Sequence, residues 1–305
     1  MKKTVVMFAG QGSQYQNMGL DFLEHSKDAK LIFDNAAEKL DFNLLEVLNS
    51  ELINDTKYTQ SLVFLTSAMI YEEVKKILVP DAVIGFSLGE YSAYYASDVM
   101  SFNDTLEVVK NRSKFMAEAA DRNPGSMAAI IGISKENLED ICNAINDCYV
   151  TIANYNEPKQ LVISGNLECV NKVCSIALEK GARRAIPLNV SGAFHSELMI
   201  DAGKALKEFL NNSDIEIKKP KYPIWLNASG EKYLNEELID IMEKQVFSPV
   251  LFYQAIEDLI EKGYNNFIEI GPGKVLSGLV KKINRDVNVI NVSYYEDLEK
   301  LKEMF

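Results

Sequence analysis

The chain has 305 residues, of which 47% are hydrophobic and 25% are charged, proportions that are ordinary for a soluble globular protein. Its formal net charge of −12 argues against nonspecific binding to nucleic acid and against docking on anionic membranes. The length allows either one large α/β domain or two domains.

The first expected strand covers residues 4–9, and a glycine-rich turn containing Gln11 follows it. Tyr15 stands where a dinucleotide fingerprint needs its third glycine, so a phosphate cradle is not expected. The turn is either a plain connection or a loop whose main-chain N–H groups face a ligand. The apolar run at the start is too short for a signal peptide, and no apolar stretch reaches the ~18 residues that span a bilayer. We therefore expect a cytoplasmic protein.

Residues 21–79 have a mostly helical pattern, and an apolar strand at 82–84 then meets the sequence GFSLG at 85–89. The pattern G-x-S-x-G is that of a nucleophile elbow, in which a strand turns sharply into a helix and exposes one serine. A bare match arises by chance in about one chain of this length in ten. The strand before it and the helical pattern after it favour the elbow, with Ser87 as the nucleophile.

The next expected helix covers residues 102–120 and has one polar and one apolar side. Arg112 falls in the middle of the apolar side. A guanidinium keeps its proton, so burying it without a partner is costly. From the residues alone, Arg112 has either a structural carboxylate partner or an anionic ligand.

The pattern changes after Asn123, where a small domain is expected. Strands are expected at 127–131, 149–153, 161–164 and 183–188, a turn at 154–158, and helices after Ser134 and Asn166, the expected N-caps. The order β-α-β-β-α-β is typical of a ferredoxin-like unit. We therefore predict an α/β fold, with a mainly parallel sheet and the elbow in a large domain (1–124 and 191–305) and a ferredoxin-like small domain (125–190) inserted into it.

The cysteines lie at 142, 148, 169 and 174, without a C-x-x-C pair, and the two histidines are far from them in sequence. Neither a metal site nor a disulfide framework is expected. Cys142 and Cys174 lie on the apolar sides of expected helices, where core packing explains them.

A serine nucleophile needs a base, and the chain contains only two histidines, His25 and His195. His25 is given no role, because charged and polar residues surround it, whereas His195 follows the expected small domain. Acyl transfer would then use Ser87 and His195, with the main-chain N–H of Leu88 and that of Gln11 as oxyanion donors. No acidic residue between 87 and 195 stands out to orient the histidine, and no HGGG motif is present, so the chain does not match an ordinary α/β-hydrolase.

The chain resembles the malonyl-CoA:acyl carrier protein transacylases of fatty acid synthesis and the related acyltransferase domains of polyketide synthases. The resemblance covers nearly the whole length and rests on eight segments in the family's order. They are FAGQGSQ at 8–14, IGFSLGEYSA at 84–93, Arg112 with Met116, SMAAIIG at 126–132, ANYNEPKQLVISG at 153–165, SGAFHSELM at 191–199, QVFSPV at 245–250 and EIGPGKVLSGL at 269–279.

The resemblance implies a role for each matching position. Ser87 would carry the malonyl ester, His195 would be the base, and the N–H groups of Gln11 and Leu88 would form the oxyanion hole. Arg112 would bind the malonyl carboxylate as a bidentate ion pair, with Met116 and Phe194 also in the substrate site. In the family a main-chain carbonyl orients the histidine, and Gln245 matches that position. The family often has histidine where this chain has Phe86, so polar support beside the serine would be missing.

The resemblance also implies the partners, malonyl-CoA and acyl carrier protein, and a ping-pong reaction that needs no metal and no other cofactor. We expect a monomer that binds neither nucleic acid nor membranes. Candidates for a basic docking patch are Arg183, Arg184, Lys281, Lys282 and Arg285, for which solvated surface is an equal alternative. Three rival functions remain: a trans-acting acyltransferase of a polyketide synthase, a serine thioesterase or esterase, and a non-catalytic binding protein.

Overall fold

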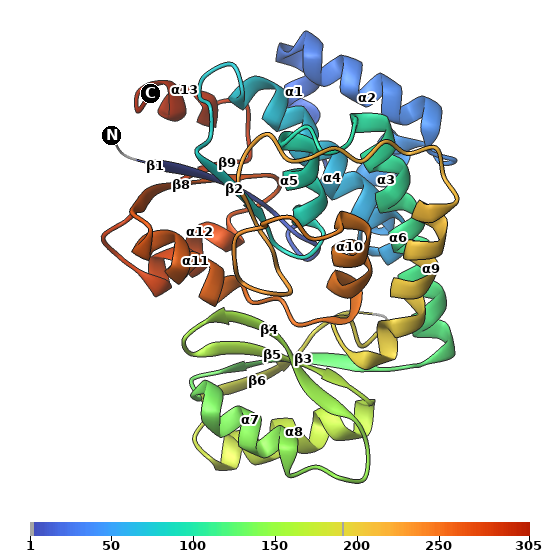
Figure 1. The fold of residues 1–305 in the computed structure, drawn as a ribbon, viewed down its shortest axis with the longest axis vertical. Helices are drawn as coiled ribbons and strands as arrows, with labels where there is room; N and C mark the ends of the chain where they lie inside the picture. The colour runs from blue at the N-terminus through green and yellow to red at the C-terminus, as the bar shows by residue number, and fades with distance from the viewer. Residues whose placement is uncertain (1–2, 191) are drawn as a thin grey trace.

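The computed structural model describes residues 3–190 and 192–305 and contains two β-sheets (Figure 1). The larger sheet has the strand order β7-β2-β1-β8-β9, and every paired neighbour is parallel. Its strands are β1 (Lys3–Phe8), β2 (Ala82–Gly85), β7 (Ile224–Trp225), β8 (Tyr264–Ile270) and β9 (Asn288–Val292). The expected parallel sheet is confirmed, and β9 is a strand that the sequence analysis missed.

Alternate residues of β1 face opposite layers of helices, as the two-residue period of a strand requires. Val6 and Phe8 belong to one core with α4, α5 and α6, while Val5 and Met7 belong to another with α11 and α12. The bounds of these helices are α4 (Thr56–Val74), α5 (Gly89–Ala96), α6 (Phe102–Arg122), α11 (Phe252–Glu261) and α12 (Val275–Ile283). The parallel sheet is thus covered on both faces, so the ends of its strands are where functional loops can lie.

The remaining helices surround this framework. They are α1 (Leu20–His25), α2 (Lys27–Lys39), α3 (Leu44–Leu48), α9 (Ile200–Asn211), α10 (Leu238–Phe247) and α13 (Asp297–Lys302), with 3₁₀ turns at Glu51–Asn54 and Glu197–Met199. None of the helices in the described ranges is long and apolar enough to cross a membrane.

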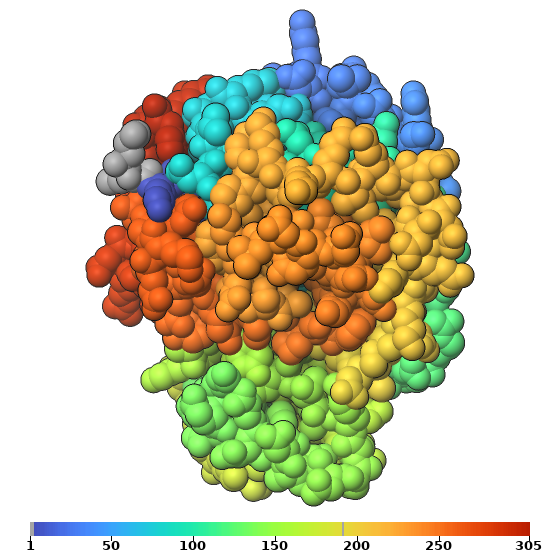
Figure 2. All heavy atoms as spheres, viewed as in Figure 1, coloured from blue at the N-terminus to red at the C-terminus, as the bar shows by residue number. Residues whose placement is uncertain are grey.

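The second sheet is antiparallel, with the order β4-β5-β3-β6, and α7 and α8 cover one face (Figure 1). Its elements are β3 (Ser126–Ile131), α7 (Lys135–Asn143), β4 (Val150–Glu157), β5 (Gln160–Gly165), α8 (Leu167–Glu179) and β6 (Arg184–Pro187). The chain order confirms the ferredoxin-like arrangement. In Figure 2 these residues, coloured green to yellow, form a lobe packed beneath the segments coloured orange.

The other face of the small sheet packs against the larger unit through helices and the returning chain. Met127, Ala129 and Val162 belong to the same core as Phe194 on the returning chain. Edge strand β4 is also tied to the segment after α10, because Val250 N–H donates to Ala153 O at 2.8 Å. The exact domain boundaries stay a prediction, and their positions at residues 1 and 191 lie outside the described ranges.

Two local predictions in the small sheet were wrong. The turn expected at 154–158 is strand for most of its length, because β4 continues to Glu157 and Tyr155 N–H donates to Val250 O at 2.9 Å. Asn166 lies at the N-cap of α8, but its side chain makes no cap there and instead accepts the N–H of Tyr149 at 2.8 Å. Ser134, in contrast, caps α7 as expected, accepting from Asn137 N–H.

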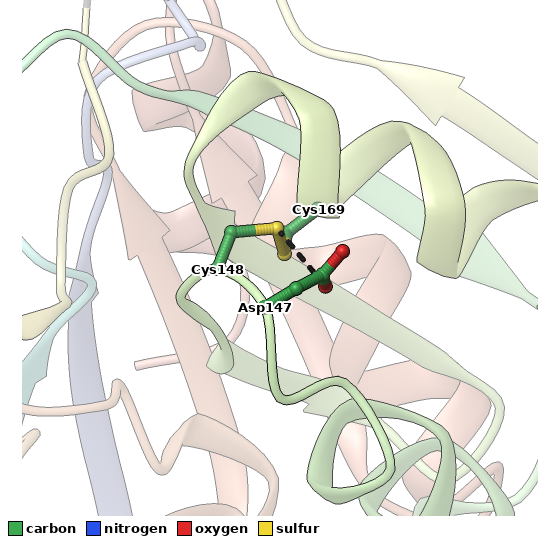
Figure 3. Close-up of side chains that lie close together, drawn as sticks. All are labelled: Asp147, Cys148 and Cys169. Carbon is green, nitrogen blue, oxygen red and sulfur yellow. Dashed lines mark hydrogen bonds between the residues drawn. A yellow bond between two sulfur atoms is a disulfide. The ribbon is translucent and has the colours of Figure 1, made fainter.

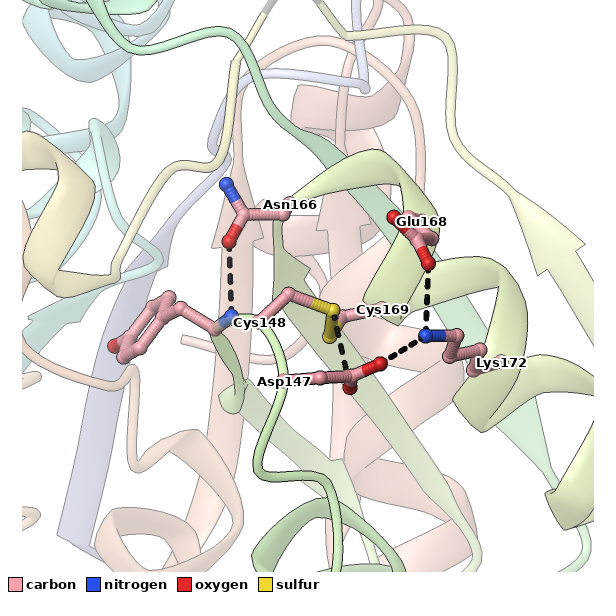
Figure 4. The surroundings of a disulfide bond; sticks show 7 residues. Asp147, Cys148, Asn166, Glu168, Cys169 and Lys172 are labelled. Atoms are coloured by element: carbon pink, nitrogen blue, oxygen red, sulfur yellow. Dashed lines mark hydrogen bonds and ion pairs between the residues drawn. A yellow bond between two sulfur atoms is a disulfide. The ribbon is translucent and has the colours of Figure 1, made fainter.

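The expectation that no disulfide forms was also wrong. Cys148, before β4, and Cys169, in the first turn of α8, are joined by a disulfide, with 5.9 Å between their Cα atoms (Figure 4). Lys172 bridges Asp147 and Glu168 beside it. Sequence spacing gave no signal for the pair, because the antiparallel pairing of β4 with β5 brings the two segments together. Cys142 is buried in the small core as expected, and Cys174 is half-buried against it.

The disulfide predicts a thiol count. Denatured, unreduced protein should react with a thiol reagent at Cys142 and Cys174 only, and at all four cysteines after reduction. Titration with a chromogenic disulfide reagent before and after reduction measures both values. Four reactive thiols in protein isolated without reductant would contradict the pairing.

Candidate active site

Three loops that carry polar residues leave the carboxyl ends of adjacent parallel strands, the usual place for a site in such a sheet. Gln11 follows β1, Ser87 follows β2 and Asn227 follows β7. The turn at Ser87 requires glycine on both sides. A Cβ on Gly85 would lie 1.8 Å from Gly89 C, and one on Gly89 would lie 2.1 Å from Phe8 O.

Ser87 itself has a φ of +50°, in the left-handed region that L-residues disfavour. The strand before it and helix α5 after it match the expected elbow. The conformation projects the hydroxyl of Ser87 toward the histidine, and its Oγ lies 2.7 Å from Nε2 of His195.

Two main-chain carbonyls hold the other side of the imidazole. Nδ1 of His195 lies 3.1 Å from the O of Gln245 and 3.1 Å from the O of Ser248. A carbonyl can only accept, so Nδ1 carries the proton and Nε2 is free to accept the Ser87 hydroxyl proton. This arrangement does the work of the carboxylate that the sequence analysis could not find.

The burial of His195 controls its protonation. The residue is 4% exposed, and this desolvation, reinforced by the nearby Arg112 guanidinium, lowers its pKa from 6.5 to about 4. At neutral pH the ring is therefore neutral and able to act as a base.

The two expected oxyanion donors lie on neighbouring loops. Within the ranges that the structure describes, the main-chain N–H of Gln11 and that of Leu88 donate no hydrogen bond. Leu88 also stands at the start of α5, where the helix dipole favours negative charge. Ser87 N–H is committed to Asn227 Oδ1 at 2.6 Å, so it is not a third donor. Both expected N–H groups are thus free to donate to a developing oxyanion.

Arg112 is 1% exposed and projects from α6 to the nucleophile. Its Nη2 lies 3.4 Å from Ser87 Oγ and donates to Gln245 Oε1 at 3.1 Å, while Nη1 donates to Gln60 Oε1 at 2.6 Å. Both amide oxygens are neutral. Within residues 3–190 and 192–305, Arg112 makes no ion pair and its Nε has no hydrogen-bond partner. The structural carboxylate, one of the two alternatives from the sequence, is not found there.

Met116 and Phe194 are both buried beside these groups. Met116 lies one turn after Arg112, and its sulfur accepts from Gln60 Nε2 at 3.6 Å. Phe194 immediately precedes His195 and packs in the core that joins the two sheets. Their contact with a substrate stays a prediction.

Phe86, unexplained in the sequence, has a packing role. Its ring lies 5.5 Å from that of Phe252 on α11, and its Cδ1 would be 3.2 Å from a Cβ placed on Gly10. The aromatic ring at this position therefore packs the elbow against helix α11. His25 lies in α1 and stacks on Tyr295, with 4.7 Å between the ring centroids.

Sequence reasoning missed the main-chain carbonyl of Ser248 and three polar side chains of the site. Gln60 and Glu90 are buried polar residues inside largely apolar helical runs, and Asn227 is a buried polar residue in the turn after β7. A buried polar group needs a hydrogen-bond partner, so each could have been flagged by its position. Which partner each one meets depends on tertiary packing.

One other group of side chains has donor atoms close enough to suggest a metal. In the described ranges, Asp147, Cys148 and Cys169 lie within 4.8 Å of one another (Figure 3). Both sulfur atoms belong to the disulfide, so a single carboxylate remains as a ligand. The group lies in the small sheet's unit, apart from Ser87 and His195.

Comparisons with known proteins agree with this geometry. Residues 5–298 match the family described as acyl transferase domain. The chain is 42% identical to the malonyl CoA-acyl carrier protein transacylase of Bacillus subtilis, over 98% of this chain and 96% of that one. The crystal structure of the Clostridium perfringens transacylase of the same name superposes with a TM-score of 0.93 at 38% identity, covering 99% and 98% of the chains. A malonyl-transacylase in complex with a type II PKS acyl carrier protein gives 0.95 at 30% identity, with full coverage of both chains, 100% each.

The lowered pKa of His195 predicts the pH dependence of Ser87 reactivity. Because the ring stays neutral until pH approaches about 4, labelling of Ser87 by a fluorophosphonate should be constant from neutral pH down to about pH 5 and fall below that. Removing a positive charge favours imidazolium, so Arg112→Gln should move the acidic limb to higher pH. The measurement is the labelling rate across pH. If the labelling rate of the wild-type protein already fell with a midpoint near pH 6.5, the lowered pKa of His195 would be contradicted.

Proposed function

The chain belongs to the acyl transferase family, and from this membership we propose that it transfers the malonyl group of malonyl-CoA to the phosphopantetheine thiol of acyl carrier protein, as in fatty acid synthesis. The observation that carries the proposal is Arg112, a buried cation without a carboxylate partner in the described ranges, 3.4 Å from the nucleophile. An acyl group that ends in a carboxylate supplies the missing charge.

In the first half-reaction, Ser87 Oγ attacks the thioester carbonyl while His195 Nε2 takes the hydroxyl proton. The tetrahedral oxyanion is stabilised by the N–H groups of Gln11 and Leu88. The C–S bond then breaks, CoA leaves as the thiol with the proton from His195, and malonyl remains as an ester on Ser87. Since Nδ1 stays bonded to the carbonyls of Gln245 and Ser248, the ring keeps its orientation as the charge appears.

In the second half-reaction, the carrier thiol attacks the same ester carbonyl. His195 takes the thiol proton and returns it to Ser87 Oγ as the ester bond breaks, so the enzyme is restored. The same two main-chain donors serve both oxyanions, because in each tetrahedral intermediate the former carbonyl carbon is bonded to Ser87 Oγ. Each step written here uses side chains and main-chain groups of this chain.

Arg112 selects the acyl group in this proposal. Its guanidinium offers Nε and the remaining Nη hydrogens to a carboxylate, and planar two-point pairing is favoured in a site from which water is excluded. The amide oxygens of Gln60 and Gln245 hold the guanidinium in place without neutralising it. A neutral acyl group such as acetyl would leave the charge buried and unpaired, which disfavours it. Met116 and Phe194 line the apolar side of the site.

A basic groove supports the assignment of an acidic carrier protein as the second substrate. Its volume is about 440 Å³, and basic side chains outnumber the one acidic side chain in its lining. The charged residues of the lining are Lys159, Arg183, Arg184, Lys282, Arg285 and Glu157. Lys281, another candidate from the sequence, bonds instead to the carbonyl oxygens of Arg285 and Val287. On a chain with net charge −12, such a local patch is where an acidic partner can dock.

The nucleophile assignment predicts a covalent adduct. Wild-type protein mixed with malonyl-CoA should gain the mass of one malonyl group, and peptide mapping should locate it on Ser87. Ser87→Ala should gain none, whereas Ser92→Ala, which alters a buried serine of the same helix region, should acylate normally. Intact-mass spectrometry measures all three. An adduct on Ser87→Ala would refute the assignment.

The role of Arg112 predicts a change of acyl preference. Arg112→Ala should lower the rate of malonyl transfer by about 10²–10³-fold, as the loss of a charged contact in a dry site does, and should raise the rate with acetyl-CoA relative to malonyl-CoA. Arg122→Ala, at the exposed end of the same helix, is the matched control and should change neither rate. Competition between the two thioesters measures the preference. An unchanged ratio in Arg112→Ala would exclude Arg112 as the carboxylate contact.

A further inference from the structure

A second buried charged residue lies in the site and has no part in the steps above. Glu90, in the first turn of α5, has no exposed surface. One carboxylate oxygen accepts the hydroxyl of Tyr94 at 2.7 Å, and the other accepts the main-chain N–H of Asn227 at 2.6 Å. Burying a carboxyl group is costly unless its oxygens are hydrogen-bonded, so the two partners of Glu90 are what let it remain here, and they show what it holds in place.

Asn227 transmits this contact to the elbow. Its side-chain Nδ2 donates to Gly85 O at 2.7 Å, and its Oδ1 accepts Ser87 N–H at 2.6 Å. Its own carbonyl accepts Leu251 N–H at 2.9 Å. The carboxamide therefore bridges the main chain on both sides of Phe86, at the point where strand β2 turns into the nucleophile.

The two hydrogen bonds of the Asn227 carboxamide lie next to a main-chain conformation that is unfavourable by itself. Ser87 has a positive φ that its Cβ disfavours, and such a conformation persists only when surrounding contacts determine it. Gln245 Nε2 donates to Ser87 O at 2.7 Å and fixes the other side of the residue. The bond from Ser87 N–H fixes the peptide before the nucleophile, and the Gln245 bond fixes the peptide after it.

We propose that Glu90 and Asn227 are positioning residues for Ser87: the Glu90 carboxylate orients Asn227, and the Asn227 carboxamide holds the elbow so that Oγ meets His195. The proposal rests on the proposed function only in taking Ser87 as the nucleophile. Neither residue touches the reacting atoms in this assignment. Both act through the main chain of the elbow.

The acceptor role of Glu90 rests on its hydrogen bonds, since its burial by itself disfavours the charged form. Burial raises its pKa to about 7, while Tyr94, Asn227 and the Arg112 guanidinium oppose that rise. Tyr91 and Tyr94 are the other titratable groups that face it. The two donors that it meets are an O–H and an N–H, so the group accepts at both oxygens.

The test compares variants by the rate at which Ser87 is labelled with a fluorophosphonate and, separately, acylated by malonyl-CoA. Asn227→Ala should lose about 10²-fold in both rates, because a small displacement of a nucleophile costs that much, with KM for malonyl-CoA little changed. Asn227→Asp still accepts Ser87 N–H but cannot donate to Gly85 O, and should lose at least about tenfold. Tyr71→Phe, which removes a buried hydroxyl bonded to Ala96 O, is the matched control and should keep wild-type rates.

Glu90 is tested by rescue. Glu90→Leu should resemble Asn227→Ala, whereas Glu90→Gln keeps an acceptor for Asn227 N–H and should recover most of the rate. A merely structural role would raise KM and lower the melting temperature without this selective loss of kcat. If Asn227→Ala does not fold, Asn227→Asp decides the matter.

The possible outcomes separate this proposal from the proposed function. Wild-type labelling rates in Asn227→Ala, or in a folded Asn227→Asp, would overturn the positioning role. Slow labelling of the variants would support it even if malonyl-CoA failed to acylate the wild-type protein, a result that would count against the proposed function alone.

Discussion

Ser87 keeps a main-chain conformation that L-residues disfavour, and the surrounding structure supplies what holds it there. The parallel sheet ends at this point, Gly85 and Gly89 leave no room for side chains, and α5 begins immediately. Because the turn is fixed, the hydroxyl, the Leu88 N–H and the first turn of α5 all have defined directions. His195 and Arg112 reach Ser87 from other parts of the chain, so their distances to its hydroxyl depend on that fixed turn.

Burial determines the electrostatics of the site. A neutral His195 and a charged Arg112 lie close together away from water, and each makes its hydrogen bonds to neutral oxygen atoms. Two main-chain carbonyls orient the imidazole, so the histidine needs no carboxylate beside the guanidinium. Within the described ranges no carboxylate forms an ion pair with Arg112, and the buried Glu90 acts on it only as a nearby charge, so the guanidinium stays available for an acyl carboxylate.

Local patterns in the sequence predicted the elbow, the parallel sheet and the ferredoxin-like order, whereas the pairing of Ser87 with the distant His195 came from the chemical need for a base and the scarcity of histidine. Strand β9 was missed because its sequence is short and half-polar, and the Cys148–Cys169 disulfide because strand pairing creates it. Phe86 and Asn227 were visible in the sequence, but what they do depends on their tertiary neighbours, Phe252 and the elbow itself. Local chemistry was readable, whereas contacts between distant segments required the structure.

The central claim is that acyl groups pass from Ser87 to a carrier thiol rather than to water. The most direct measurement loads the protein with malonyl-CoA, removes excess substrate, adds carrier protein that bears phosphopantetheine and follows both masses with time. The account predicts that malonyl leaves the enzyme only when the carrier is present and appears on the carrier in equal amount. Loss of malonyl at the same rate without the carrier, with release of free malonate, would contradict it and identify a hydrolase.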